Sequence, residues 1–313
     1  MILNEEYVIE RGGIRLDAAL LTKFPDSRRA FIADAIAAGE ILVNGRRAPK
    51  GMKLRGGENV SVARLVELSD VAVAPNPSIG VRLVHEDQAL LAFDKPSGIA
   101  VHPLSLGETG TLMNGVVARF PECTGVGDTR LCAGALHRID SGTSGLVLVA
   151  RSQEAFDALR AQFTNHTIEK TYLALVEGNV TDGATLENDL AHDPTLSYCR
   201  MIDAAHNRLT RAQREKLRPM HAVTTFRPIA HTTFENEERT LLEVTIFTGV
   251  THQIRAQLSL AGIHIINDRL YGAFAVEDQL GHCLHALRAK FSHPVTGAPT
   301  TISTTPPPWA TAL

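Results

Sequence analysis

The chain has 313 residues, of which 44% are hydrophobic and 21% are charged, a composition typical of a globular protein. This balance excludes disordered, collagen-like and coiled-coil proteins. No apolar run approaches the roughly 18 residues that a membrane helix needs, and the opening MILNEEYVIERGG lacks the regions of a signal peptide. We therefore expect a soluble, cytoplasmic protein. The formal net charge of −3, taken alone, disfavours a nucleic acid as partner.

Metal and disulfide chemistry is not indicated by the cysteines. The chain has four scattered cysteines and no CxxC pair: Cys123, Cys132, Cys199 and Cys283. Such spacing predicts neither a disulfide framework nor a thiolate zinc site. The cluster His282, Cys283 and His285 has no second group at ligand spacing, so structural roles are favoured for it. We expect no metal and no cofactor.

The length suggests one large domain or two unequal ones. Residues 1–70 are expected to form a small first domain. Residues 71–79 include most of DVAVAPNPS, whose two prolines predict an extended linker. Residues 80–313 then remain for a larger second domain.

Within the first domain the predicted order is helix, helix, small sheet. Apolar residues recur at helical spacing over 14–20, and a second helix is expected to be capped by Ser27 and to end at Gly39. The segment ILVNGRR contains an Asn-Gly pair that predicts a tight hairpin. The last strand is expected over 59–63.

The first domain carries a positive charge that the overall sum hides. Residues 11–64 contain eleven basic and five acidic residues, a net charge of +6. Five basic side chains at the second helix and the hairpin could face one phosphate surface: Arg28, Arg29, Arg46, Arg47 and Lys50. The alternative is an ordinary solvated charged face, which a run of charge by itself favours.

The order of elements in this domain resembles the S-four type RNA-binding domain. The resemblance lies in IRLDAAL, SRRAFIADAIAAGEILVNGRR and a closing GGENVSV, about fifty residues in all. That family uses the helix pair and the hairpin to hold structured RNA. The resemblance therefore favours RNA binding over a merely solvated face.

From residue 80 onward, strands and helices alternate irregularly. Strands are predicted in VRLVHED, ALLAFDKP, GLVLVAR, EKTYLALVEG, HAVTTFRPIA and TLLEVTIFT. Helices are predicted in TLMNGVVARF, after a Ser152 cap, and in THQIRAQLSLAG. The last of these should be capped by Thr251, turn Ile254, Leu258 and Ala261 inward, and end at Gly262. This pattern predicts an α+β domain with a large, mainly antiparallel sheet.

The segment HRIDSGTSG, residues 137–145, is the strongest candidate for chemistry because it is dense in polar groups and leads into an apolar strand. Neighbouring hydroxyls and backbone N–H groups could hold the Asp140 carboxylate, and glycines would allow a ligand to approach closely. The alternative is that Asp140 merely caps a turn. Kinase, Walker, G-x-S-x-G, HExxH and dinucleotide motifs are absent from the sequence. Chemistry without a cofactor is therefore the leading class.

Four ordered motifs resemble those of the RluA-type pseudouridine synthases. HRIDSGTSGLVLVARS is similar to that family's HRLDxxTSGLLLLAK segment, and DKPSGIAVHP precedes it as the family's first motif does. EKTYLALVEG resembles the KxYxALVxG strand, and FTGVTHQIRAQLSLAGIHIINDRLYG resembles the later helix and loop. Together they cover most of residues 80–300. The resemblance implies the pseudouridine synthase fold, a mixed sheet flanked by helices.

The resemblance also implies roles for particular residues. Asp140 matches the essential carboxylate, which would attack the sugar, attack the base or promote elimination. Tyr172 matches a tyrosine that packs on the uracil, and Arg255 matches the arginine that pairs with the catalytic aspartate. Arg138 is placed to help extrude the target nucleotide from its stack.

The chain departs from the family pattern at three positions. Val250 stands where a basic residue is usual, Gln257 replaces the usual histidine, and Asn267 replaces the usual glycine before Asp268. A second basic segment, residues 199–221, carries six basic and two acidic residues, a net charge of +4. It predicts either a loop that faces RNA or a solvated helix.

We therefore expect an RNA pseudouridine synthase that acts without cofactor or metal, as a monomer and away from membranes. Large-subunit ribosomal RNA is the favoured substrate, because family members with this N-terminal module often act there. Transfer RNA is the alternative substrate. A non-catalytic RNA-binding protein of ribosome assembly is the alternative from another functional class.

Overall fold

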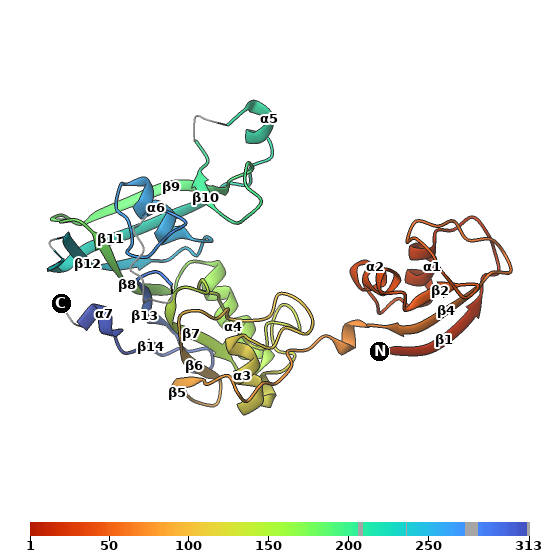
Figure 1. Cartoon of the computed structure of the whole chain (residues 1–313). Coiled ribbons are helices and arrows are strands. Elements are labelled where there is room, and N and C mark those ends of the chain that lie inside the picture. Colours follow the sequence, from red (N-terminus) through yellow and green to blue (C-terminus); the bar gives the residue numbers. More distant parts are fainter. Residues whose placement is uncertain (206–208, 236, 273–280, 312–313) are drawn as a thin grey trace. The chain divides into compact units, whose positions relative to one another are not determined.

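The computed structural model describes residues 1–205, 209–235, 237–272 and 281–311 of the chain. It divides into two compact units, residues 1–72 and residues 73–313. The first is drawn from red to orange in Figure 1, and the second continues through yellow and green to blue. Among the described residues, no helix combines the length and the apolar character needed to cross a membrane.

The first unit is a four-stranded antiparallel sheet with two helices. The strands lie in the order β1-β4-β2-β3. Its elements are β1 (Ile2–Val8), α1 (Leu16–Lys23), α2 (Arg29–Ala38), β2 (Ile41–Val43), β3 (Arg46–Arg47) and β4 (Asn59–Leu65), followed by a 3-10 turn at Leu68–Asp70. Leu16, Leu20 and Ile32 of the helices pack with Ile41 and Val60 of the sheet, and all five are fully buried. The unit therefore has a hydrophobic core of its own.

Two of the local predictions for this unit are confirmed and one is wrong. Asn44 and Gly45 join β2 to β3 with φ of 50° and 74°, the positive angles that a tight hairpin needs. Gly39 ends α2 with φ of 82°. Ser27 does not cap α2, because its hydroxyl instead donates to the carbonyl of Val66 at 2.8 Å. That bond ties the start of α2 to the end of β4.

Strand β1 was not predicted. It pairs with β4, but only Ile2 and Tyr7 are partly buried, so the sequence shows no alternation of buried and exposed residues. The linker expected over 71–79 packs on the second unit from Val73 onward. Val73 lies in the core of that unit, and the N–H of Asn76 donates to the carbonyl of Asn114 at 2.9 Å.

A ten-stranded mixed sheet forms the centre of the second unit. The strands run in the order β10-β9-β11-β12-β8-β13-β7-β6-β5, with β14 also paired to β13. They are β5 (Arg82–Glu86), β6 (Leu90–Lys95), β7 (Ser144–Ala150), β8 (Glu169–Glu177), β9 (Ala184–His192), β10 (Met201–Asp203), β11 (Met220–Phe234), β12 (Glu237–Ile246), β13 (Leu284–Ser292) and β14 (Pro299–Ser303). Only β7 and β13 pair in parallel among the described strands. The predicted α+β class with a mainly antiparallel sheet is confirmed.

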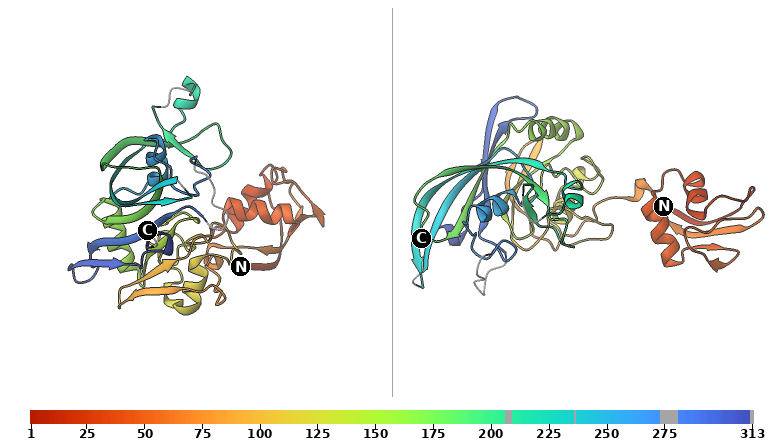
Figure 2. Two further views of the ribbon diagram at one scale, coloured as in Figure 1. Left: turned by 60° about the vertical axis from the view of Figure 1, so that its left-hand side comes forward. Right: turned by 90° about the horizontal axis from the view of Figure 1, so that it is seen from above.

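Few helices accompany this sheet, which is visibly curved in Figure 2. They are α3 (Leu112–Arg119), α4 (Gln153–Thr164), α5 (Arg211–Arg214), α6 (Gln253–Leu260) and α7 (Pro308–Thr311), with a 3-10 turn at Pro121–Cys123. Helix α4 lies against β7, and α6 lies against β9, β10 and β11. Helix α5 stands away from the sheet (Figures 1 and 2).

The predicted helix caps are partly confirmed. The Ser152 hydroxyl accepts from the N–H of Ala155 at 3.2 Å and so caps α4 as expected. In α6, Ile254 and Leu258 are buried as predicted. Thr251 is not the cap, because the chain takes a left-handed turn at His252 immediately before the helix. Ala261, predicted to face inward, is exposed.

The parallel contact between β7 and β13 fixes the segment that contains Asp140. It pairs Ser144 with His285 and Gly145 with Ala286. Gly145 has φ of 109°, and a Cβ there would lie 2.2 Å from the carbonyl oxygen of Ala286. Only glycine allows this approach. The loop before β7 is thereby held beside the chain that enters β13.

We expect Gly145→Ala to destabilise the protein by about 3 kcal/mol or more, since it adds an overlap with backbone to left-handed strain. Gly178→Ala is the matched control, because Gly178 has φ of 81° but no atom within 4 Å of a built Cβ. It should cost only about 1 kcal/mol. Urea unfolding measures both variants. Equal losses in the free energy of unfolding would show that the close approach of Gly145 to β13 does not contribute to the effect.

Candidate active site

Asp140 lies in the loop immediately before β7, and backbone contacts to the segment after β6 hold that loop. The N–H of Gly98 donates to the carbonyl of Ser141 at 2.8 Å, and the Ser97 hydroxyl donates to the carbonyl of Gly142 at 2.8 Å. The Asp140 side chain remains 25% exposed. The loop therefore presents a carboxylate at a surface that a ligand can reach, while its backbone is fixed at the two residues that follow Asp140.

Lys95 also holds this loop through its side chain. Its side chain is fully buried, and its ammonium donates to the carbonyls of Pro96 and Ile99, both at 2.8 Å, and of Ser141 at 3.1 Å. Burial lowers the pKa of Lys95 to about 8, while the nearby Asp140 charge acts in the opposite direction. Lys95 thus links the first motif to the residue that follows Asp140.

Arg255 joins two carboxylates in one buried ion-pair group. Its Nη1 donates to Oδ2 of Asp140 at 2.7 Å. Its Nε and Nη2 donate to the two carboxylate oxygens of Asp268, at 2.6 and 2.8 Å. The Arg255 side chain is 8% exposed and that of Asp268 is 2% exposed. The predicted pairing of Arg255 with Asp140 is present, and the bidentate contact with Asp268 fixes the guanidinium plane.

Electrostatic interactions keep both members of the buried pair, Arg255 and Asp268, charged. Although burial by itself disfavours the charge, hydrogen bonds and charges of Asp268 and Asp140 raise the pKa of Arg255. Burial likewise opposes ionisation of Asp268, but the Arg255 hydrogen bonds and charge lower its pKa. One cation and two carboxylates leave a net negative charge at the Asp140 end. In the part of the chain that is described, Oδ1 of Asp140 has no hydrogen-bond partner.

Tyr172 lies in β8 between β12 and β13, where it pairs with Val244 and Ala286. Its side chain is buried at 7% exposure, within the main hydrophobic core. Burial raises the pKa of the Tyr172 phenol, and the Asp140 charge raises it further. The phenol is therefore neutral and lies within electrostatic reach of Asp140.

The histidines near residue 285 have hydroxyl partners. His282 Nε2 lies 2.7 Å from the Thr143 hydroxyl, and His285 lies 2.8 Å from the hydroxyls of both Ser144 and Thr304. Burial lowers the pKa of each imidazole to about 4. Together these contacts bind the loop after Asp140 to β13. The described residues contain no cluster of three or more His, Cys, Asp or Glu side chains arranged to hold a metal ion.

The basic side chains predicted to face RNA are exposed. This holds for Arg138 beside Asp140 and for five residues of the first unit: Arg28, Arg29, Arg46, Arg47 and Lys50. Arg138 forms no ion pair with any described residue. Arg47 differs from the others, since it donates to the carbonyl of Ala38 at 3.2 Å and so caps the end of α2.

The second basic segment contains β10, α5 and the chain on either side of them. Arg211 pairs with Glu215 at 3.0 Å, and both side chains are largely exposed. Arg200 instead lies over the ring of Tyr271 at 5.7 Å. Arg208, which contributed to the predicted net charge, lies outside the described residues. The RNA-facing role of this segment stays a prediction.

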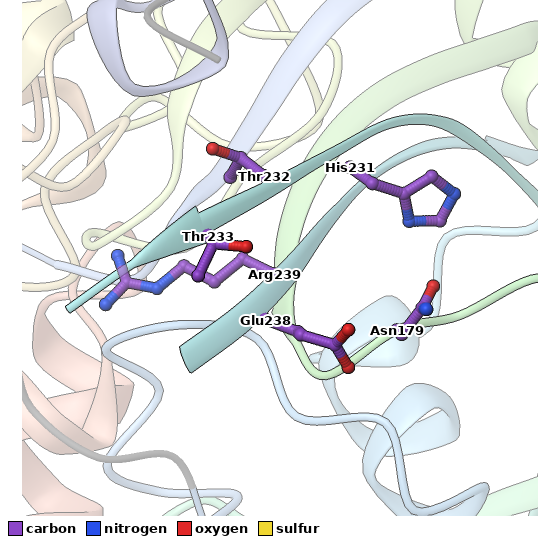
Figure 3. Close-up of a pocket in the computed structure, with 6 residues that line it drawn as sticks. All are labelled: Asn179, His231, Thr232, Thr233, Glu238 and Arg239. Carbon is purple, nitrogen blue, oxygen red and sulfur yellow. The ribbon is translucent and has the colours of Figure 1, made fainter. Parts of the chain in front are cut away.

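Of two cavities in the second unit, one shares no residue with this site and the other is bordered by Lys95. One of about 120 Å³ near the far end of β11 and β12 is lined by Asn179, His231, Thr232, Thr233, Glu238 and Arg239. Figure 3 shows Arg239 directed away from His231 and Asn179. A groove of about 870 Å³ is lined by the 80–82 and 94–96 segments, Ser144, His285 and residues 305–308. Neither is lined by Asp140, Tyr172 or Arg255.

Residues 89–260 match the family described as RNA pseudouridylate synthase. The chain belongs to this family. Asp140, Tyr172 and Arg255 all fall within the matched segment of the synthase. Residues 14–60 match the S4 domain, and this match contains the five basic residues predicted to face RNA. Both family resemblances inferred from the motifs are confirmed, and so is the assignment of the chain as an enzyme.

Relatives of the synthase are similar over most of its length. It is 34% identical to the ribosomal large subunit pseudouridine synthase D of Xanthomonas campestris, with 92% of this chain and 84% of that one covered. Identity to the protein of the same name from Neisseria meningitidis is 31%, with 92% and 75% covered. An uncharacterized RNA pseudouridine synthase of Bacillus subtilis, YlyB, is 30% identical, with 92% and 89% covered.

Two solved structures share the fold of the synthase. Human RNA pseudouridylate synthase domain containing 1 superposes with a TM-score of 0.58 at 20% identity, over 74% of this chain and 85% of that one. Human RNA pseudouridylate synthase domain containing 4 gives a TM-score of 0.53 at 17% identity, over 74% and 90%. The predicted pseudouridine synthase fold is confirmed.

At each of the three positions that depart from the family pattern, the structure shows how the residue fits its surroundings. The Gln257 amide donates to the carbonyl of Ala222 at 2.9 Å and to Asn188 Oδ1 at 2.7 Å, which joins α6 to β9 and β11. Asn267 takes φ of 65°, so the chain keeps a left-handed turn where glycine is usual. Val250 packs beside the small cluster around Tyr271 and supplies no charge.

Four residues of the site were not predicted: Lys95, His252, Asp268 and Tyr271. Lys95 and Asp268 are charged residues within largely apolar segments, and such residues are rarely buried unless they are paired. That signal was present in ALLAFDKP and GIHIINDRLYG. His252 and Tyr271 gave no such signal, because both residue types are common in partly buried positions.

We expect Arg255→Met to cost about 3–5 kcal/mol, because Asp268 would remain buried without a cation. The double variant Arg255→Met with Asp268→Leu should recover part of this loss. Because pairing lowers the pKa of Asp268 in the folded protein, the pair stabilises above pH 3.8 and its contribution fades as the pH falls below that value. Urea unfolding of the single and double variants at pH 7 and pH 3.5 measures both effects. A loss that is the same at both pH values would contradict the assignment.

Proposed function

We propose that the synthase isomerises uridines in large-subunit ribosomal RNA and that Asp140 is its catalytic carboxylate. The observation that supports this most is the ion-pair group of Asp140, Arg255 and Asp268. It fixes one oxygen of Asp140 and leaves the other without a partner among the described residues. An accessible carboxylate whose other oxygen is held by a guanidinium suits a reaction at a sugar carbon.

The reaction requires one bond to replace another. The bond between N1 of uracil and C1′ of ribose breaks, the base turns, and a bond between C5 and C1′ forms. A proton leaves C5 and one is gained at N1, so atoms and electrons balance within the substrate. This balance requires no redox group, which supports action without a cofactor or metal.

Asp140 would act on the ribose side of this reaction. Its free oxygen can stabilise positive charge at C1′ or bond to it, and an elimination route would use the same oxygen as a base. Arg255 holds the other oxygen, Oδ2, and so orients the carboxylate. It does not supply a proton, since its pKa is raised. Arg255 is therefore a positioning residue.

Tyr172 and Arg138 would act on the base. Tyr172 has a neutral phenol within reach of the Asp140 charge, which suits packing on uracil in a water-poor site. Arg138 is exposed two residues before Asp140 and has no ion-pair partner among the described residues. A free guanidinium there can hold a phosphate or fill the space that a flipped nucleotide leaves.

Two relatives carry names that specify the large ribosomal subunit, and these names support ribosomal RNA as the substrate. The S4 domain with its exposed basic residues supports binding to structured RNA outside the reaction site. Transfer RNA and a non-catalytic role in ribosome assembly remain the alternatives that the next experiment separates. Action as a monomer in the cytoplasm stays a prediction.

Asp140→Asn should abolish pseudouridine formation, because it keeps an acceptor for Arg255 but removes the charge. RNA from cells that lack the protein would be mapped for pseudouridine after wild-type or Asp140→Asn protein is added back. A large-subunit site should be lost in the deletion strain and restored by the wild type alone. Loss confined to transfer RNA would overturn the substrate. Restoration by the Asn variant, or retention of every site, would overturn the catalytic assignment.

Replacing Arg46 and Lys50 with Ala should weaken RNA binding and flatten its salt dependence by about two counterions. Arg47 is left intact because it caps α2. The control is Arg227→Ala with Lys290→Ala, which removes the same charge from residues already paired with Glu243 and Glu169. Filter binding to ribosomal RNA fragments from 50 to 300 mM salt measures the slopes. An equal slope in both double variants would show that the S4 face is merely solvated.

A further inference from the structure

His252 stands at a strained position beside the ion-pair group. It takes φ of 53° and ψ of 20° immediately before α6, and Arg255 follows one turn later. Its side chain is 14% exposed. The left-handed region costs a non-glycine residue roughly 1–2 kcal/mol. The backbone conformation at His252 therefore lowers the stability of the folded protein.

A chain of hydrogen bonds fixes the His252 ring. The N–H of Met201 donates to the Tyr271 hydroxyl at 2.8 Å, and that hydroxyl lies 3.1 Å from Nδ1 of His252. Among the described residues, Nδ1 is the only acceptor in range of the Tyr271 proton. The two rings also meet edge to face, with centroids 5.8 Å apart. When Tyr271 donates to Nδ1, the imidazole proton lies on Nε2, which is the tautomer that donation to Asp140 requires.

The Nε2 atom of His252 faces the carboxylate of the reaction site. It lies 3.9 Å from Oδ2 of Asp140, the same oxygen that Arg255 contacts. Burial lowers the pKa of His252, and the nearby Arg255 charge acts in the same direction although Asp140 opposes it. The ring is therefore a neutral donor. It is not a competing cation.

We propose that His252 is a positioning residue for Asp140, which acts by donating from Nε2 to Oδ2. This inference rests on the proposed catalytic role of Asp140. Two donors on Oδ2 would prevent the carboxylate from rotating and keep Oδ1 directed at the ribose. The separation of 3.9 Å closes to a hydrogen bond when RNA is bound, as contacts in unliganded sites commonly do. The strain at His252 is then the cost of aiming Nε2 at Asp140.

At position 252, the side chain must be long enough to place a donor at Asp140; a polar side chain alone is not sufficient. Asparagine tolerates the left-handed backbone, but its amide ends near the position of Nδ1. Glutamine extends to about the position of Nε2 and can donate there. His252→Asn and His252→Gln are therefore a matched pair that differs by one methylene.

Single-turnover and steady-state kinetics on a ribosomal RNA fragment test this pair. His252→Asn should lower kcat by about 10- to 100-fold, the effect of one hydrogen bond to a charged group, with KM unchanged. His252→Gln should recover kcat to within about threefold of the wild type. Thermal unfolding should show both variants folded. Equal kcat values for the two variants, whether both high or both low, would overturn the proposal.

The tautomer provides a readout that does not depend on activity. In protein labelled with ¹⁵N at its 13 histidines, the resonances lost in His252→Gln identify this ring. The wild type should show a protonated Nε2 and a bare Nδ1, and Tyr271→Phe should weaken that preference. A proton on Nδ1 in the wild type would overturn the proposal.

Asp140→Asn, measured in the same kinetic assay, separates this inference from the proposed function. If Asp140→Asn is inactive and His252→Asn behaves as the wild type, the positioning role fails and the catalytic role of Asp140 stands. If Asp140→Asn retains wild-type activity, the proposed function itself fails. The positioning role is supported when Asp140→Asn is inactive, His252→Asn is impaired and His252→Gln is restored.

Discussion

The contact of Arg255 with two carboxylates is the interaction on which the rest of the site depends. A guanidinium is expensive to bury, and its attraction to one partner seldom offsets the loss of hydration. Here both edges of the planar group are occupied, by Asp268 on one side and by Asp140 on the other. Because Asp268 is more deeply buried, it anchors the arginine, and Asp140 is left at the accessible end.

The sheet brings these groups together from distant parts of the chain. The loop before β7 supplies Asp140, α6 supplies Arg255, and the loop that follows α6 supplies Asp268. Parallel pairing of β7 with β13 holds the Asp140 loop beside the start of β13, and Gly145 permits the close approach. Lys95 then ties the loop to the end of β6. Among the described strands, this mainly antiparallel sheet contains one parallel contact, and that contact fixes the loop that carries Asp140.

The net charge of this chain is a poor guide to whether it binds RNA, because the charge is unevenly distributed. The formal net charge is −3, yet the S4 domain carries a local excess of basic residues and Arg138 stands exposed beside Asp140. Phosphate is recognised locally, within about a Debye length of 10 Å. An acidic protein can therefore bind RNA through separated basic surfaces and a pocket for one nucleotide. Counting basic residues also overstates the groups available to RNA, because Arg47 donates one of its hydrogen bonds to the end of α2.

The sequence by itself determined what depends on neighbouring residues: the hairpin at Asn44 and Gly45, the end of α2 at Gly39, and the ordered motifs that identify the family and Asp140. It failed where a distant partner decides. Ser27 bonds to Val66 across the first unit. The pairing of Arg255 with Asp140, 115 residues away, was predicted from the family resemblance, but its second partner, Asp268, was not. Only the tertiary structure decided the roles of Lys95, Asp268, Tyr271 and His252. A charge within an apolar segment indicates burial of Lys95 and Asp268, but the partners that decide each role come together only in the assembled sheet.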